Sequence, residues 1–384
     1  MKAGGFEKSA TSPVRTIRTC AKLGDMTQHT SHTRLPGLDG VRALAVIGVV
    51  WHHTEPGGAA LPSLPFGLNL NGFLGVDLFF ALSGLLITGL LLREHAHNGR
   101  ISLAKFYVRR SLRIFPLYYA VLALLTLYFA GAASSDSTQR SAFLHDLPWL
   151  VTYTSNWVPI HELMGITWSL STEEQFYLAW PPLLAWLGRR ALWPLLVFLG
   201  LNQALNLGLL NGWWPALDHA RNELAILQAT FTPILLGVLL AFALDSPAPR
   251  AALQRLTDGP ALAAWLLLLA ALACWPGDIQ GWPRLAFHVV ATVALAGIVL
   301  HPSSRIVSAL EWKPLAFIGM VSYGIYLLHL IVLDAAQRAL SRWHVDLPGA
   351  LFVVGLAGTV ALAALSYRFF ERPLLRLKDR WRSA

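Results

Sequence analysis

Apolar runs long enough to cross a lipid bilayer follow one another along most of this chain of 384 residues. A hydrocarbon core about 30 Å thick needs about 20 apolar residues in helical form, and most of the runs approach that length. Only 13% of the residues are charged, whereas a soluble domain carries about a quarter. The predicted fold class is therefore all-α, a polytopic membrane helix bundle with about ten transmembrane helices. The predicted spans lie near residues 38–54, 72–92, 107–130, 168–188, 191–209, 224–244, 261–275, 284–300, 314–337 and 348–370.

The distribution of Lys and Arg predicts how these helices are oriented, because cytoplasmic loops of membrane proteins carry an excess of both. With the N-terminus inside, the inner loops and the C-terminal end hold seventeen of these residues and the outer loops hold five. We therefore expect cytoplasmic N- and C-termini in a multi-pass protein of the inner (plasma) membrane. The net charge of +9 follows from the same rule, so nucleic acid is not an expected partner.

The two ends of the chain differ from the apolar middle. Residues 1–34 are polar and basic and lack the apolar core of a signal peptide, so we expect a disordered cytoplasmic tail, with Met26 as an alternative start. The membrane domain is predicted over residues 35–375, followed by a short basic cytoplasmic tail at 376–384. The segment at 142–157 is shorter and more polar than the spans, and we interpret it as an interfacial or re-entrant helix.

The first span carries a cation near its start and an imidazole at its end. Arg42 and His53 are eleven residues apart, which places them on one helix face about 16 Å apart along the axis. A structural interpretation is that Arg42 reaches the lipid headgroups and His53 lies at the far interface. The alternative is that the two residues mark the ends of one polar path through the membrane.

The second span contains an acidic residue, Asp77, near its outer end. A buried carboxylate in a membrane helix is costly, so Asp77 is expected to have a partner. Ser83 and Gly84 lie deeper in the same span, and small residues there usually let helices pack closely.

Three arginines, Arg109, Arg110 and Arg113, gather at the cytoplasmic start of the third span. They could be ordinary anchors of the positive-inside rule, or they could clamp phosphate groups, which match the guanidinium fork bidentately.

Two adjacent carboxylates, Glu173 and Glu174, open the fourth span. Ser171 and Glu174 have capping-box spacing, which gives Glu174 a structural role at a helix N-terminus. Glu173 shares a helix face with Tyr177 and is the better candidate for a functional role.

The ninth span carries a polar stripe on an otherwise apolar helix. Ser322, Tyr326 and His329 recur at i, i+4 and i+7, so they lie on one face. A histidine at the end of a row of hydroxyls is typical of the wall of a polar cavity.

Taken together, these motifs resemble the acyltransferase-3 family of integral-membrane O-acyltransferases. The resemblance covers about residues 35–375 and depends on six motifs in order. They are the Arg42 and His53 spacing, Gly75-Val-Asp-Leu-Phe-Phe-Ala-Leu-Ser-Gly84, Arg110 and Arg113 with Pro116, Trp168-Ser-Leu-Ser-x-Glu-Glu-Gln-Phe-Tyr177, Ser322-Tyr-x-x-Tyr-Leu-x-His329, and Phe369-Phe-Glu-Arg-Pro373.

The resemblance implies transfer of an acyl group, usually acetyl, from cytoplasmic acyl-CoA to a hydroxyl. Acceptors in the family include surface polysaccharides, lipopolysaccharide sugars, nodulation factors and macrolide antibiotics. Matched residue by residue, it makes His53 the essential histidine and places Arg42, Arg110 and Arg113 in the donor-binding set. Some relatives carry a further span and an extracytoplasmic hydrolase-like domain; this sequence ends soon after the tenth span, so we expect no such domain in it.

The mechanism expected from these residues is direct transfer, with His53 as general base on the acceptor hydroxyl. Acyl-CoA (acetyl-CoA being the family default) would bind through its phosphates to Arg109, Arg110 and Arg113. Glu173 or Glu174 could assist the histidine, and an acyl-His53 intermediate is an open variant. The side chains expected to bind substrate are Asp77, Tyr177, Ser322, Tyr326 and His329. No metal is expected, and Cys20 and Cys274 indicate neither a disulfide framework nor a metal site.

A transporter or permease is the competing class, because it too would place His, Glu and Arg side chains inside a membrane bundle. The sequence shows no internal repeat of the kind that many transporters have, and release of CoA would discriminate the two. A non-catalytic membrane scaffold is a weaker alternative. The sequence leaves open the acceptor, the acyl chain and the oligomeric state.

Overall fold

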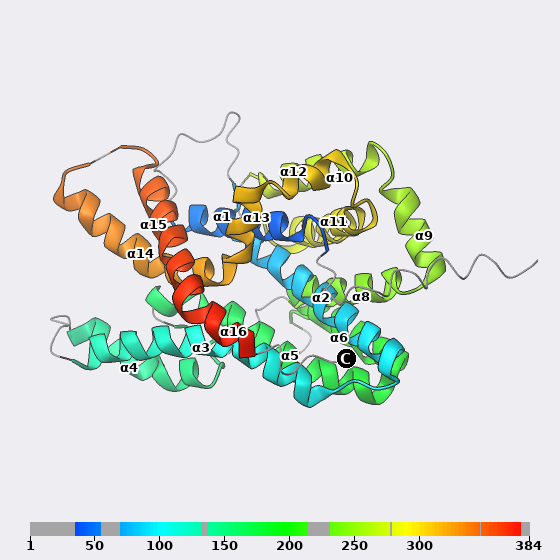
Figure 1. Ribbon diagram of the computed structural model, residues 1–384, viewed down its shortest axis with the longest axis horizontal. Coiled ribbons are helices and arrows are strands. Elements are labelled where there is room, and N and C mark those ends of the chain that lie inside the picture. Colours follow the sequence, from blue (N-terminus) through cyan, green and yellow to red (C-terminus); the bar gives the residue numbers. More distant parts are fainter. Residues whose placement is uncertain are drawn as a thin grey trace, which may run out of the picture. The chain divides into compact units, whose positions relative to one another are not determined.

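A computed structural model describes residues 35–54, 70–131, 137–160, 162–212, 231–276, 279–345 and 347–377. The regular elements in these ranges are helices, with no β-strand among them (Figure 1), so the all-α prediction is confirmed. The α-helices are α1 (Leu38–His52), α2 (Leu74–Asn98), α3 (Leu103–Ala130), α4 (Ser137–Val151), α5 (Thr167–Leu187), α6 (Leu192–Asn206), α8 (Thr232–Leu244), α9 (Pro247–Leu256), α10 (Ala261–Ala273), α11 (Gly281–Leu300), α12 (Arg305–Leu310), α13 (Lys313–Met320), α14 (Ser322–Arg342), α15 (Ala350–Ser366) and α16 (Arg372–Leu377). Short 3₁₀ turns at Glu162–Met164 and Gly188–Ala191 and a π-helical turn at Tyr367–Glu371 join some of them.

Five of the helical stretches are long and apolar enough to cross a membrane, and up to seven qualify if each bent pair counts as one span. The five are Leu74–Asn98, Leu103–Ala130, Thr167–Asn206, Gly281–Leu300 and Ala350–Leu377. The bent pairs are α8 with α9, at 109°, and α13 with α14, at 75°. The chain is therefore a multi-pass membrane protein, while the ten spans and the cytoplasmic termini remain predictions.

The difference from ten spans has identifiable causes. With 15 and 13 residues, α1 and α10 are shorter than the ~20 residues that one crossing needs. Thr167–Asn206 covers two predicted spans, and Gly188, at φ 56°, interrupts it. The span predicted at 224–244 begins outside the described residues, as does the N-terminal tail.

The predicted interfacial segment forms most of α4, which packs against α3. Two tyrosines of α3 make the contact: the Tyr118 hydroxyl donates to the carbonyl of Leu150 at 2.8 Å, and the Tyr119 hydroxyl to that of Val151 at 2.9 Å.

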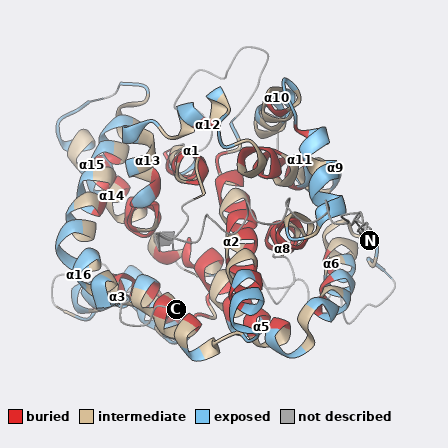
Figure 2. Ribbon diagram, turned by 45° about the vertical axis from the view of Figure 1, so that its right-hand side comes forward, coloured by how far each residue is buried: buried red, intermediate tan, exposed pale blue. Residues whose placement is uncertain are grey.

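The packed interior is built around α2, which crosses α8 closely. Figure 2 shows buried residues concentrated on α2 and α8, whereas α9 is mostly pale blue and α16 is pale blue and tan, and neither has a buried residue. A Cβ on Gly84 would collide with the carbonyl oxygen of Ile234, and one on Gly237 with that of Ala81. These two glycines therefore let the backbones of α2 and α8 touch, which is the packing role that the sequence predicts for Gly84.

The first helix lies against α2 on one side and against α13 and α14 on the other. Gly37, at φ 82°, starts α1 in a left-handed conformation, and its N–H donates to the carboxylate of Glu311 at 2.6 Å. At Val321 the chain bends between α13 and α14, so α14 begins at Ser322 and its polar stripe runs inside the bundle. This arrangement sets α1, α2, α3, α5 and α14 around one polar space.

The α2–α8 crossing gives a stability prediction. Gly84→Ala forces the two backbones apart, and we expect a loss of about 1–3 kcal/mol in the free energy of unfolding, typical of overpacking. Gly200→Ala on α6 is the matched control, because no atom lies within 4 Å of a Cβ there. Reversible unfolding of both purified variants in detergent measures the difference; equal stability of the two would contradict the close crossing.

Candidate active site

A polar cavity of about 90 Å³ lies between α1, α2, α3, α5 and α14. It brings together most of the charged residues that the sequence singles out, although they come from five separate helices. Its lining consists of Arg42, Val76, Phe79, Phe80, Ser83, Arg110, Arg113, Ile114, Ser169, Leu170, Glu173, Glu174, Ser322, Tyr323 and Tyr326.

The cations of this cavity differ in how they are held. Arg42 pairs with Asp39 on its own helix at 3.1 Å. The guanidinium of Arg110 lies over the ring of Tyr177, 3.7 Å from its centroid, and 3.9 Å from Glu173 and 4.0 Å from Glu174. Such a cation–π contact fixes the orientation of the guanidinium plane.

The third cation of the cavity, Arg113, forms no ion pair with a carboxylate of the described residues. Its side chain is exposed where it lines the cavity, and no carboxylate of the described residues lies within 4.0 Å of it. An arginine fork in this state can accept an anionic ligand without first breaking an ion pair.

The carboxylate of Glu173 is held by a hydroxyl group, and Glu174 does not form the cap that its spacing suggests. Helix α5 begins at Thr167, so Ser171 lies inside it, and its hydroxyl pairs with that of Ser155 at 2.7 Å. The capping-box prediction for Ser171 and Glu174 is therefore wrong. Glu173 instead accepts a hydrogen bond from the hydroxyl of Ser83 at 2.6 Å, which ties α5 to α2.

The polar stripe of α14 runs from the cavity to the end of α1. Ser322 and Tyr326 line the cavity, and the Tyr326 hydroxyl pairs with that of Ser169 at 2.6 Å. One turn further along, His329 is fully buried, and its ring packs against that of His53 with 4.9 Å between the ring centroids.

The contacts of these two histidines fix where their protons lie. His329 Nδ1 is 2.6 Å from the carbonyl oxygen of Tyr326, and since a carbonyl only accepts, this nitrogen carries a proton. In the neutral ring Nε2 is then an acceptor, and it lies 3.3 Å from His53 Nδ1. His53 Nδ1 also lies 2.9 Å from the carbonyl oxygen of Val49. Both contacts of His53 Nδ1 require it to donate, so Nε2 of the neutral, exposed His53 ring is left with a lone pair.

The other exposed histidine at this end, His52, points elsewhere. Its ring packs against Phe73, with 5.5 Å between the centroids. The contacts of Nδ1 with Val49 and His329 distinguish His53 from His52. His53 is also the histidine that the spacing from Arg42 singles out.

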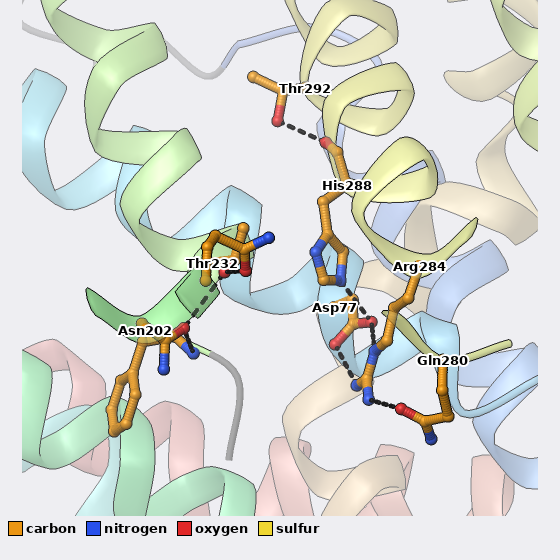
Figure 3. A network of polar contacts seen from close by, with 9 residues as sticks. Asp77, Asn202, Thr232, Gln280, Arg284, His288 and Thr292 are labelled. Atoms are coloured by element: carbon orange, nitrogen blue, oxygen red, sulfur yellow. Dashed lines mark hydrogen bonds and ion pairs between the residues drawn. The ribbon is translucent and has the colours of Figure 1, made fainter. Parts of the chain in front are cut away.

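Five of the predicted site residues do not line the polar cavity, namely His53, His329, Tyr177, Asp77 and Arg109, and the last two are paired elsewhere in the bundle. Asp77 is 1% exposed and bound bidentately by Arg284, with both N–O distances 3.0 Å, while His288 Nε2 lies 2.9 Å from the same carboxylate (Figure 3). Arg109 is buried and pairs with Glu94 at 3.5 Å. Both are paired within the helix bundle, as expected for buried charges.

Several residues at the site escaped the sequence reasoning. Ser169 and Tyr323 line the cavity, and Ser83 holds Glu173. Ser83, Ser169 and Tyr323 all stand inside the motifs quoted above, so they could have been found there. Arg284 and His288, the partners of Asp77, could also have been identified, because they are polar residues four apart on one face of an apolar run.

Several known proteins are similar to this chain in sequence. The family described as "Acyltransferase domain" matches residues 35–368. Peptidoglycan O-acetyltransferase OatA of Listeria monocytogenes is 30% identical over 379 residues, which cover 90% of this chain and 56% of OatA. YrhL of Bacillus subtilis, provisionally named a peptidoglycan O-acetyltransferase, is 31% identical over 91% of this chain and 56% of its own length. A provisionally named O-acetyltransferase of Staphylococcus aureus is 30% identical over 92% of this chain and 59% of its own length. No solved structure matches the chain.

The buried Asp77 network gives a second prediction. Asp77→Asn leaves Arg284 buried without its carboxylate, and we expect a loss of about 3–5 kcal/mol of stability. Asp334→Asn, which removes the exposed pair with Arg338, is the matched control and should cost less than about 1 kcal/mol. Thermal unfolding of the purified variants measures both, and similar melting temperatures would contradict a structural role for Asp77.

Proposed function

The chain belongs to the acyltransferase family that matches residues 35–368, and on this premise we propose that it moves an acyl group from acyl-CoA to a hydroxyl of a carbohydrate acceptor. The chain spans a little under three fifths of the length of the curated relatives above, so their activity enters here as a proposal. Two of them are named for peptidoglycan, and a surface glycan is accordingly the acceptor class that we propose. The acyl group proposed is acetyl, and the location proposed is the inner membrane with both termini in the cytoplasm.

The observation that carries the proposal is the free Nε2 of His53. A general base needs an unprotonated nitrogen within reach of the acceptor hydroxyl, and the contacts of Nδ1 with Val49 and His329 leave Nε2 in that form. His329 therefore acts as a positioning residue, because it orients the ring through an acceptor nitrogen. No carboxylate of the described residues lies within 4.0 Å of His53, so this role falls to an imidazole and a backbone carbonyl rather than to Glu173 or Glu174.

The proposed reaction is a direct displacement at the thioester. His53 Nε2 takes the proton of the acceptor hydroxyl while the oxygen attacks the carbonyl carbon of the acyl group. The carbon–sulfur bond then breaks, and the proton passes from the imidazolium to the departing CoA thiolate. The products are the O-acyl ester and free CoA, so atoms and charge balance without a metal or an oxidant.

The polar cavity supplies the proposed donor site. The arginines Arg42, Arg110 and Arg113 converge there, and phosphate groups suit guanidinium forks. Arg113 is the primary anion contact in this proposal because it has no carboxylate partner, whereas Arg109 is committed to Glu94. From Arg42, α1 leads to His53 over about 16 Å, a distance that the extended arm of CoA would bridge.

The proposal predicts that His53→Ala abolishes transfer. Loss of a general base reduces the rate by about 10²- to 10⁴-fold, and acetyl-CoA binding should be unchanged because the arginines lie at the other end of α1. CoA thiol release in the presence of a glycan acceptor measures the rate. His52→Ala is the matched control and should retain activity within a few-fold. A wild-type rate in His53→Ala would overturn the mechanism, and transport of the acceptor without CoA release would favour the permease alternative.

A further prediction concerns the donor. Arg113→Ala should weaken acetyl-CoA binding at least tenfold, because the substitution removes an ionic contact to phosphate inside a bundle of low polarity. Arg113→Lys should recover only part of the affinity, since lysine lacks the bidentate fork. Isothermal titration with acetyl-CoA measures the dissociation constant. Arg100→Ala is the control, because Arg100 is an exposed arginine outside the cavity. Equal affinity in the Arg113 and Arg100 variants would mean that Arg113 is only an ordinary anchor of the positive-inside rule.

A further inference from the structure

A second cavity in the described part of the chain is larger than the polar one and almost entirely apolar. It has a volume of about 570 Å³ and lies between α1, α2, α10 and α11. An engineered apolar cavity of about 150 Å³ already binds benzene, so a space several times that size holds a substantial hydrocarbon group. None of its lining residues is charged.

The apolar cavity follows the face of α1 that turns away from the polar cavity. Val41, Leu44, Gly48 and Trp51 line it, whereas Arg42 and His53 lie on the opposite side of the helix. From Val41 to Trp51 the helix rises about 15 Å. That length is about half of the ~30 Å hydrocarbon core, so it matches a chain reaching down from one leaflet.

The apolar cavity is open to the surface that faces the bilayer. Three residues of its lining, Leu44, Leu70 and Ala270, are exposed, Leu44 by 54%. Next to Ala270 on α10, Leu267 is 72% exposed, as expected for a helix that contacts lipid. A hydrocarbon chain in the bilayer therefore has direct access to the cavity.

The two ends of the apolar cavity differ in chemistry. At the end near Val41 the walls are apolar, with Ile298, Ile306 and Leu310. At the other end Trp51 packs edge-on against Phe352, with 5.0 Å between the centroids. This end leads directly to His52 and His53, and the lining residue Asn71 adds an amide there that bonds to the carbonyls of Ala273 and Trp275. An amphiphile in the cavity would therefore place its polar head at the histidine end.

We propose that this apolar cavity holds the hydrocarbon chain of an amphiphilic acceptor, so that its hydroxyl-bearing head lies beside His53. The proposal rests on the proposed acyl transfer, and it adds the acceptor's chemical class: a hydroxyl compound carried on a hydrocarbon chain. The alkyl chain anchors the acceptor on one face of α1, while acyl-CoA approaches along the other face, so the two substrates meet at the end of the helix.

Cys274 provides a binding test that does not depend on activity. It lines the apolar cavity, and it is the free cysteine of the described residues. In a Cys20→Ser background in phosphatidylcholine nanodiscs, decyl glucoside should slow labelling of Cys274 by N-ethylmaleimide several-fold, and methyl glucoside at the same concentration should not. Ala270→Phe, which fills the cavity from an exposed position, should remove this protection.

Kinetics test whether the bound amphiphile is an acceptor. With acetyl-CoA as donor, CoA release should show a higher kcat/KM for decyl glucoside than for methyl glucoside. Ala270→Phe should lower the ratio of the two kcat/KM values at least tenfold. Val353→Phe, on the exposed face of α15, should leave the ratio as in the wild type. Because all variants share one bilayer, partition of the longer glycoside into lipid cancels in this comparison.

The outcomes separate this proposal from the one on which it depends. Protection of Cys274 together with a ratio that falls in Ala270→Phe supports it. Equal protection by decyl and methyl glucoside, or protection that survives in Ala270→Phe, overturns it and assigns the cavity to bulk lipid. Protection without acetylation of either glucoside also overturns the acceptor role. In that case, CoA release with another acceptor would leave the acyltransferase proposal standing.

Discussion

The cost of burying charge in an apolar helix bundle governs where the ionic side chains of the described helices lie. Asp77 is matched by Arg284, and Glu94 by Arg109, each across two helices. These pairs offset the cost of burying charge, because an unpaired charge in such surroundings would destabilise the fold by several kcal/mol. Against this background Arg113 stands out: it faces the polar cavity with no carboxylate partner within 4.0 Å among the described residues. A cation that lines a cavity without a carboxylate partner indicates a site that an anionic ligand completes.

The first helix divides the chemistry of the protein in two. One of its faces carries Arg42 into the polar cavity, and the opposite face, from Val41 to Trp51, lines the apolar one. At the end of this helix, His53 contacts His329. A helix of 15 residues can keep two such spaces apart because its backbone polar groups are satisfied internally and only its side chains face the cavities. The proposed meeting of donor and acceptor at one imidazole depends on this division.

Much of the candidate site was predictable, and the failures share a cause. The arginines Arg42, Arg110 and Arg113, the two glutamates, Ser322 and Tyr326 were all expected, and the polar cavity collects them. Asp77 and Arg109 were expected there too and instead form buried pairs. The capping box at Ser171 failed because α5 begins one turn earlier, at Thr167, where the Ser155 hydroxyl offers another partner. Each error concerns which partner a polar group finds, and partners come from segments distant in sequence.

The sequence by itself determined that the chain is a helical membrane protein, because hydropathy and helical periodicity are local properties. It also fixed which residues share a helix face, as for Ser322 and Tyr326. Only the tertiary structure decided that His329 contacts His53, that Ser83 holds Glu173, and that an apolar space runs along the far side of α1. These features depend on close crossings such as that of Gly84 with α8, where backbones touch and the register between helices is set. Such contacts join residues that lie between 90 and 276 positions apart, so no local pattern specifies them.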